Sequence, residues 1–259
     1  MNYTNFALSM GQSTISQAWR ALLFLFFSIP NFSYADSFED KFFDLPSYWE
    51  QAVSKSSNIR LGNEHSLFRW PSEELKIAVF FEGTDKKSIL SQMNTAFEGD
   101  RKFIEEATGI SISLGLWEDE DPAPSIYVLI GNKVELLSRS NYLTKRFGYP
   151  SFPSELAKHA ARGRPLCYLA QKSGGKGSLS LAVITVDRDH SPSYCLRLQL
   201  LAALGLTGTL ADQAPSILSS SRQFEYYQEL DKILLGILYQ PSIDLTDPSA
   251  AIKAYLDAH

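Results

Sequence analysis

The chain has 259 residues, 44% of them hydrophobic and 20% charged, and a formal net charge of −5. This is the composition of an ordinary globular protein, and the chain shows no low-complexity tract or repeat. The acidic balance argues against a nucleic-acid-binding protein and against binding to anionic membrane surfaces.

The first 35 residues have the pattern of a secretory leader. Arg20 is their only charged side chain, and it precedes the apolar run 21–29. That run is far shorter than the roughly 20 apolar residues that cross a bilayer. A small-x-small tripeptide, 33–35, follows it, as at a signal-peptidase site. The alternative is that this run is a buried core helix.

We predict a signal peptide over residues 1–35, cleaved between Ala35 and Asp36, with either Met1 or Met10 as the start. Cleavage would leave 224 residues and, with one arginine gone, a formal net charge of −6. The mature protein would have no membrane span and would be exported, to the periplasm or the medium.

The remainder divides into an N-terminal extension, 36–65, and one domain, 66–259. Apolar and β-branched runs in the domain predict five strands, near 75–82, 110–116, 125–130, 166–172 and 179–186. Helical patterns are predicted at 86–107, 132–162, 224–239 and 247–256. These elements predict an α+β fold, in which a small mixed sheet packs on a buried central helix.

Two loops have compositions found in ligand-binding loops, but the spacing of their residues does not match the known motifs. The acidic loop 118–121 has four consecutive acids and lacks the alternation and central glycine of a calcium loop, so a solvated loop is favoured. The glycine-rich segment 173–178 lacks Walker spacing and leads into a strand, so it predicts a hairpin turn.

Cys167 and Cys195 are the only cysteines. In an exported chain an even pair predicts a disulfide, here closing 28 residues of chain. The alternative is a cysteine nucleophile, for which only His190 lies nearby in sequence.

The central helix is predicted to follow Ser191. Ser191 and Pro192 fit the start of a helix, and Gly205 fits the left-handed residue after its last turn. From position 195 to 204 only Arg197 and Gln199 are polar, which is typical of a buried helix.

The end of this helix, Ala-Leu-Gly-Leu at 203–206, resembles the zincin metallopeptidases. Their metal helix often reads His-Glu-x-x-His-x-Leu-Gly-Leu, with two histidines on one face that bind Zn²⁺ and a glutamate that acts on the bound water. On that pattern Leu198 and Ala202 occupy the histidine positions, Gln199 the glutamate position, and Gly208 the third histidine position. None of these side chains supplies the zinc chemistry, so no catalytic or metal-binding residue and no cofactor is predicted.

Further pieces resemble the domain-of-unknown-function 2927 family, which comprises exported bacterial proteins grouped with the zincins. The matching pieces are Trp70-Pro71, Phe81-Glu-Gly83, Ala107-Thr-Gly109, Cys195 with Leu204-Gly-Leu206, Pro215-Ser-Ile217, and Leu230-Asp231 with Ile233-Leu-Leu235 and Ile237 to Pro241. The family helix reads Cys-x-x-Glu-Glu-x-x-Gln-x-Leu-Gly-Leu, so its two glutamates fall on Leu198 and Gln199 and its glutamine on Ala202. The resemblance implies a zincin-like fold with a degenerate metal helix.

Three functions stay open. The first is a non-catalytic zincin-like protein, a pseudo-metallopeptidase, that binds a peptide or protein partner in the cell envelope. The second is a metallopeptidase with atypical ligands, for which the four histidines, His65, His159, His190 and His259, provide no i, i+4 pair. The third is a structural component of the envelope.

Overall fold

The computed structural model of the chain describes residues 44–54, 67–80, 86–116, 125–147, 152–163, 165–175 and 177–258. The predicted signal peptide, its cleavage site between Ala35 and Asp36, and the acidic loop 118–121 lie outside these residues.

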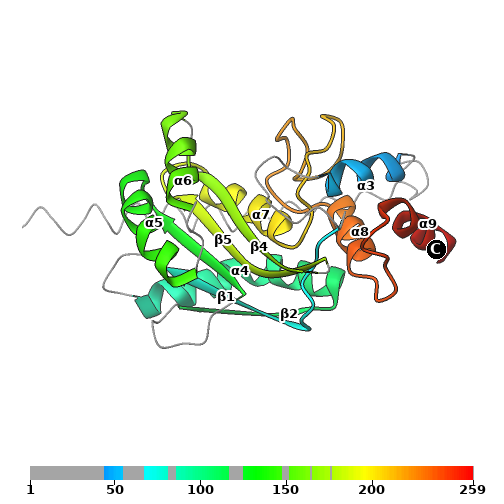
Figure 1. Ribbon diagram of the computed structural model, residues 1–259, viewed down its shortest axis with the longest axis horizontal. Helices are drawn as coiled ribbons and strands as arrows, with labels where there is room; N and C mark the ends of the chain where they lie inside the picture. Colours follow the sequence, from blue (N-terminus) through cyan, green and yellow to red (C-terminus); the bar gives the residue numbers. More distant parts are fainter. Residues whose placement is uncertain are drawn as a thin grey trace, which may run out of the picture.

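Five strands form one sheet in the order β2-β1-β3-β5-β4 (Figure 1). Their bounds are β1 Glu74–Phe80, β2 Ser111–Leu116, β3 Ile126–Gly131, β4 Cys167–Gly175 and β5 Ser178–Asp187. The pairings β1–β2, β1–β3 and β3–β5 are parallel, and β4 runs antiparallel to β5 at the edge. The mixed sheet and all five strands are therefore confirmed, and the sheet is mostly parallel.

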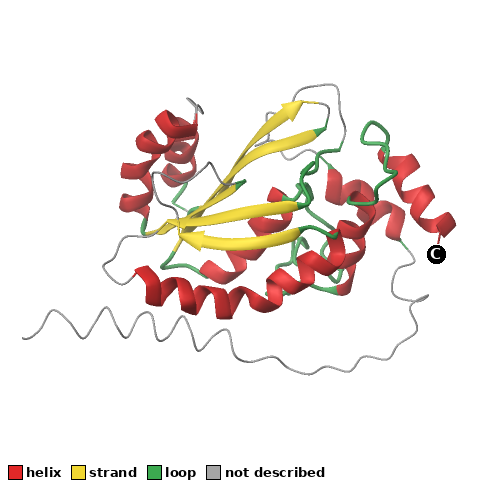
Figure 2. Cartoon of the chain, turned by 90° about the horizontal axis from the view of Figure 1, so that it is seen from below, coloured by secondary structure: helices red, strands yellow, loops and turns green. Residues whose placement is uncertain are grey.

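Helices cover both faces of this sheet (Figure 2). Their bounds are α3 Leu45–Val53, α4 Lys86–Thr108, α5 Lys133–Phe147, α6 Phe152–Ala161, α7 Pro192–Ala203, α8 Glu229–Leu238 and α9 Pro248–Ala258. Buried side chains of α4, α7 and α8 share one apolar cluster, whereas those of α5 and α6 belong to a second cluster on the opposite face. The sheet thus lies between two helical layers.

Strand β3 shows why the sequence builds this arrangement. Ile126 and Val128 contribute to the cluster beneath α7, and Tyr127 and Leu129 contribute to the cluster beneath α5 and α6. Because both faces are covered, the strand is a continuous apolar run without polar alternation.

Helix α7 is the buried helix that the sequence predicts. Its end at Gly205 agrees with the prediction, but its start at Ser191 differs from it. Ser191 adopts a left-handed conformation with φ of 43° and makes no side-chain capping bond, so the predicted hydroxyl cap is wrong. Gly205 has φ of +117°, and an added Cβ would lie 2.1 Å from the carbonyl oxygen of Phe68. A glycine is therefore required at this end, as predicted.

Helix α8 begins later than the pattern predicts, at Glu229 instead of residue 224. Gln228 and Asp231 form a capping box there, in which the Asp231 carboxylate accepts a hydrogen bond from the Gln228 amide at 2.7 Å. The helix does not extend upstream because the backbone at Gln228 is extended, with φ of −114° and ψ of 166°; before it, the Glu225 carbonyl accepts a hydrogen bond from Arg197 at 3.2 Å.

Helix α3, from the predicted N-terminal extension, packs on the rest of the fold. Trp49 is fully buried and donates a hydrogen bond from its indole nitrogen to the Pro248 carbonyl at 2.7 Å. The Gln51 side chain accepts a hydrogen bond from the Ala211 amide at 2.8 Å. Residues 44–54 therefore share the main core.

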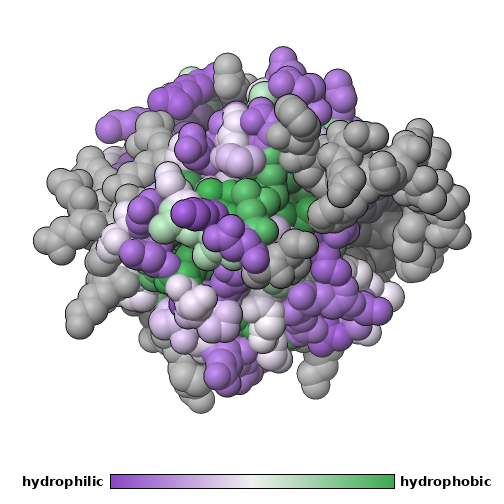
Figure 3. Space-filling view, turned by 90° about the vertical axis from the view of Figure 1, so that its right-hand side faces the viewer, coloured by the Kyte–Doolittle hydropathy of each residue, from purple (hydrophilic) through white to green (hydrophobic). Residues whose placement is uncertain are grey.

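Within the described part of the chain, no helix combines the length and the apolar character that spanning a bilayer requires. On the side of the molecule where α3, α8 and α9 lie, hydrophilic residues surround a smaller apolar area (Figure 3).

Candidate functional site

The three positions that align with the zinc motif lie in α7, which packs against strand β4. Leu198, Gln199 and Ala202, here called the motif face, are each half-buried. The Gln199 amide nitrogen lies 3.4 Å from the sulfur of Cys167 on β4. The carbonyl of Ala202 accepts a hydrogen bond of 3.0 Å from the side chain of Gln171, also on β4. These two contacts place Gln199 and the Ala202 backbone beside β4.

The chain's own side chains occupy the space between the motif face and β4. Gln171 is only 4% exposed, and its side-chain oxygen has no hydrogen-bond partner. Leu198 and Ala202 pack on the main apolar cluster. This face can hold apolar groups and one amide, and its side chains include none of the histidine, cysteine or carboxylate groups that zinc sites use. In the described part of the chain no three His, Cys, Asp or Glu residues gather in a way that could hold a metal ion.

The third position of the zinc pattern, Gly208, is closed by backbone. A Cβ added to Gly208 would lie 1.7 Å from the carbonyl oxygen of Gln51 in α3. The Gly208 amide donates a hydrogen bond of 2.8 Å to the Ala52 carbonyl. A residue with a side chain fits at position 208 only if α3 moves away.

The two cysteines tie the ends of the same two elements together. Cys167 begins β4 and Cys195 lies in the first turns of α7, with their Cα atoms 5.6 Å apart and their sulfurs bonded. This pairing is the predicted disulfide, and a disulfide is compatible with an exported protein. The free cysteine nucleophile that was the alternative is not present.

Arg197, one residue before the motif face, forms a buried ion pair that the sequence analysis missed. Its Nε donates to both carboxylate oxygens of Asp100 in α4, at 2.9 and 2.8 Å. Its guanidinium also lies 4.3 Å from the ring centre of Tyr226. Burial raises the pKa of Asp100, and the neighbouring Arg197 opposes that rise. A lone arginine in an otherwise apolar helix was the available signal.

A second buried carboxylate, Asp231, holds the segment that precedes α8. It accepts hydrogen bonds from the Ser216 hydroxyl, from the Ile217 amide at 3.2 Å and from the Gln228 amide. Burial raises the pKa of Asp231 to about 6, although these three donors lower it. This carboxylate organises the backbone between Ser216 and Gln228.

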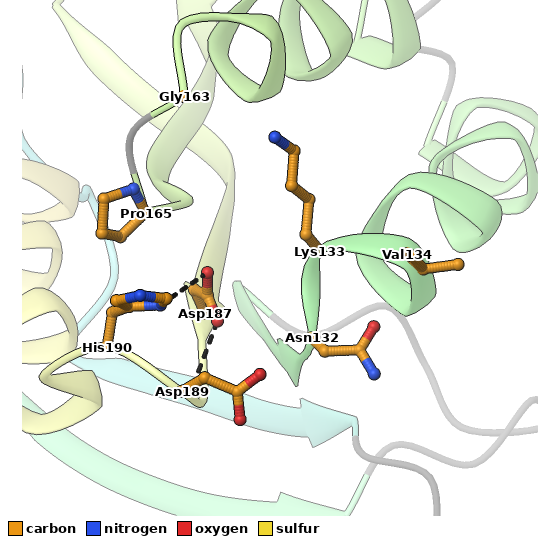
Figure 4. Close-up of a pocket in the computed structure, with 8 residues that line it drawn as sticks. All are labelled: Asn132, Lys133, Val134, Gly163, Pro165, Asp187, Asp189 and His190. Atoms are coloured by element: carbon orange, nitrogen blue, oxygen red, sulfur yellow. Dashed lines mark hydrogen bonds and ion pairs between the residues drawn. The ribbon is translucent and has the colours of Figure 1, made fainter.

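A separate polar cavity opens where β3 and β5 end (Figure 4). Asp187, the last residue of β5, is almost enclosed, with 7% of its side chain exposed. His190 Nδ1 lies 3.2 Å from Asp187 Oδ2, and the Asp189 amide donates to Asp187 Oδ1 at 3.1 Å. The Asp-x-x-His spacing was readable in the sequence but was not identified as a site.

The remaining histidines do not assemble around α7. His159 lies on α6 and packs against the ring of Tyr168, with ring centres 4.6 Å apart. His65 and His259 lie outside the described residues. Of the two histidines in the described ranges, His159 lies on α6 and His190 beside Asp187, and neither belongs to the motif face.

Comparison with known proteins adds no relative. No family model, no curated protein and no solved structure matches the chain. The functional argument therefore rests on the fold and on the residues just described.

Proposed function

We propose that the protein is a non-catalytic, zincin-like exported protein, a pseudo-metallopeptidase, and that it binds a peptide or protein partner on the motif face of α7. The observation that carries the proposal is the motif face itself, because Leu198, Gln199 and Ala202 remain half-exposed next to β4 yet include no metal ligand.

The order of elements supports the zincin-like part of this proposal. An antiparallel edge strand, β4, lies beside the helix that directly follows β5, and this helix ends in Leu-Gly-Leu at 204–206. The resemblance to the domain-of-unknown-function 2927 family points the same way.

The chemistry of the face supports binding without cleavage. A hydrolytic zinc site needs three protein ligands and a water-activating group. Two ligand positions are hydrocarbon here, and the third, Gly208, is closed by the Gln51 carbonyl. A partner would bury its apolar side chains on Leu198 and Ala202 and would hydrogen bond with Gln199.

Peptide selection on the mature protein tests this function. Peptides selected from a random library against the wild-type chain are expected to bind Leu198→Asp at least about tenfold more weakly, because a buried unpaired carboxylate costs several kcal/mol. The control variant Leu256→Asp changes a leucine on α9 that is already 50% exposed, and it should bind as the wild type does. Thermal denaturation confirms that both variants fold.

Two results would count against the proposal. Equal binding of the selected peptides by Leu198→Asp and the wild type would place the site elsewhere. Cleavage of the peptides that a chelator abolishes would instead indicate a metallopeptidase with atypical ligands.

One observation favours a structural envelope component as the second candidate. The Gln199 amide already contacts Cys167, and Gln171 fills the neighbouring space, so part of the face is satisfied within the chain. Two results together would support this structural function: selection yields no peptide, and envelope cross-linking gives a defined complex that Leu198→Asp does not change.

A further inference from the structure

The cavity at the ends of β3 and β5 lies at a point where the chain connections diverge. β3 and β5 are parallel neighbours, and Gly131 pairs with Asp187 at their last register position. From β3 the chain continues into α5 on one face of the sheet, whereas from β5 it continues into α7 on the other face. In open α/β sheets such a divergence leaves a crevice outside the carboxyl ends of the strands, where ligands bind.

The crevice has room for a small metabolite. It is open to solvent, has a volume of about 430 Å³, and is lined by the segment after β3, the segment after β5, and Gly163 and Pro165 between α6 and β4. That volume lies at the lower end of the range for small-molecule sites, about 300–1,000 Å³. The motif face of α7 does not contribute to its lining, so this site is independent of the proposed peptide-binding function.

The two walls carry opposite charge. On the β5 wall stand the carboxylates of Asp187 and Asp189, with the His190 ring beside Asp187 (Figure 4). On the other wall Lys133 extends from the start of α5 toward the segment that carries Gly163 (Figure 4). A ligand that fits this distribution has a cationic group at one end and an anionic group at the other.

Both walls keep hydrogen-bonding capacity for such a ligand. A carboxylate accepts at about four positions. The Asp187 carboxylate meets one backbone amide and one imidazole nitrogen. An ammonium group has three donors, and Lys133 directs one of them to the carbonyl of Ala160. His190 Nδ1 faces Asp187, which leaves Nε2 on the outer side of a ring that is 59% exposed.

We propose that this crevice binds a small zwitterion of amino-acid size, with its ammonium group on Asp187 and Asp189 and its carboxylate on Lys133. The ligand class follows from the opposed charges and from the volume. Asp189 is the member of this set with the weakest tie to the fold, because it is 62% exposed and makes only a long contact of 3.9 Å with Arg188.

The test uses the mature wild-type protein and the twenty common L-amino acids, each added separately. Thermal shift screens the panel, and titration calorimetry measures the hits. At least one amino acid should bind saturably, and Asp189→Asn and Lys133→Met should each weaken it about tenfold or more, the loss expected for one charge-assisted hydrogen bond.

Matched variants on α9 serve as controls. Asp257→Asn and Lys253→Met make the same chemical changes at exposed positions and should leave binding unchanged. Acetate and methylamine, tested separately as half-ligands, should bind much more weakly than the amino acid.

Three outcomes would overturn the proposal. In the first, no amino acid binds saturably. In the second, the pocket variants and the α9 variants bind alike. In the third, acetate alone binds as tightly as the amino acid, which would show a simple anion site.

Discussion

Removing the guanidinium of Arg197 should destabilise the protein strongly, because the Asp100 carboxylate would remain buried without a partner. The side chains are 6% and 13% exposed, and two hydrogen bonds of 2.8 and 2.9 Å join them. Breaking a buried pair by removing one partner costs about 3–5 kcal/mol. For a domain of this size we expect Arg197→Leu to lower Tm by roughly 10 °C.

Urea denaturation of four proteins at pH 7 measures this effect: the wild type, Arg197→Leu, Asp100→Leu and the double variant. The two single losses in the free energy of unfolding should sum to more than the double loss, because removing both charges leaves no unpaired group. At pH 4 the loss in free energy of unfolding caused by Arg197→Leu should be smaller than at pH 7. Burial raises the pKa of Asp100, and a protonated carboxyl needs no counter-charge.

The exposed pair between Lys232 and Glu106 is the matched control. It joins α8 to α4 with a similar distance of 2.9 Å, but its side chains are 35% and 46% exposed. Lys232→Met should therefore cost less than about 1 kcal/mol. If Arg197→Leu costs no more than this control, the reasoning from burial is refuted.

Three further predictions concern the same structure. Because burial raises the pKa of Asp231 from 3.8 to about 6, its contribution to stability is complete only below about pH 3, falls by about 2 kcal/mol between pH 4 and pH 6, and falls by about 3 kcal/mol in total well above pH 6. Asp231→Asn should remove that fall in urea denaturation at pH 4, 5 and 6, whereas Asp257→Asn should keep it. Replacing Cys167 and Cys195 with serine should cost roughly 3 kcal/mol, because a loop of 28 residues is no longer closed; an unchanged urea midpoint would refute this. Restoring His, Glu and His on the motif face should give no zinc that survives desalting, measured by mass spectrometry, because Gly208 cannot supply a third ligand; one retained equivalent would contradict the account of a closed position.

The elements were predictable where a local pattern determines them. The run from 126 to 131 is apolar throughout because both faces of β3 are covered, and this pattern alone predicts a buried strand. The end of α7 was equally readable, since Gly205 is the one residue type that fits beneath the Phe68 carbonyl. In each case the signal lies in a short run of adjacent residues, although the contacts that impose it, such as Gly205 with Phe68, are long-range.

Features that depend on distant contacts were not predictable. Arg197 and Asp100 are separated by 97 residues, and no periodicity links them. The structure starts α8 at Glu229, not at the predicted residue 224. Asp231 caps this start, and the Glu225 carbonyl before it accepts a hydrogen bond from Arg197. The cavity at Asp187 needs two parallel strands whose connections diverge, which only the topology reveals.

The candidate site likewise combines features that a local pattern predicts with features that depend on distant contacts. The sequence could predict that positions 198 and 202 share a face of α7, because residues i and i+4 of a helix lie one above the other. It could not show that Cys167 and Gln171 fill the space opposite, or that Gln51 closes the third position. Those contacts come from β4 and α3, whose packing no helical pattern encodes.

Protein groups alone fix the orientation of α7. Its last carbonyls accept hydrogen bonds from three side chains: Ala202 from Gln171 at 3.0 Å, Ala203 from Trp70 at 2.8 Å and Leu204 from Tyr239 at 2.8 Å. Its first turns are held by the Cys195 disulfide and by the Arg197 ion pair. Because these contacts anchor both ends of α7, the motif face can keep its position beside β4 without metal-binding side chains. The partner surface proposed for the motif face would therefore be held in place by hydrogen bonds, the disulfide and the ion pair.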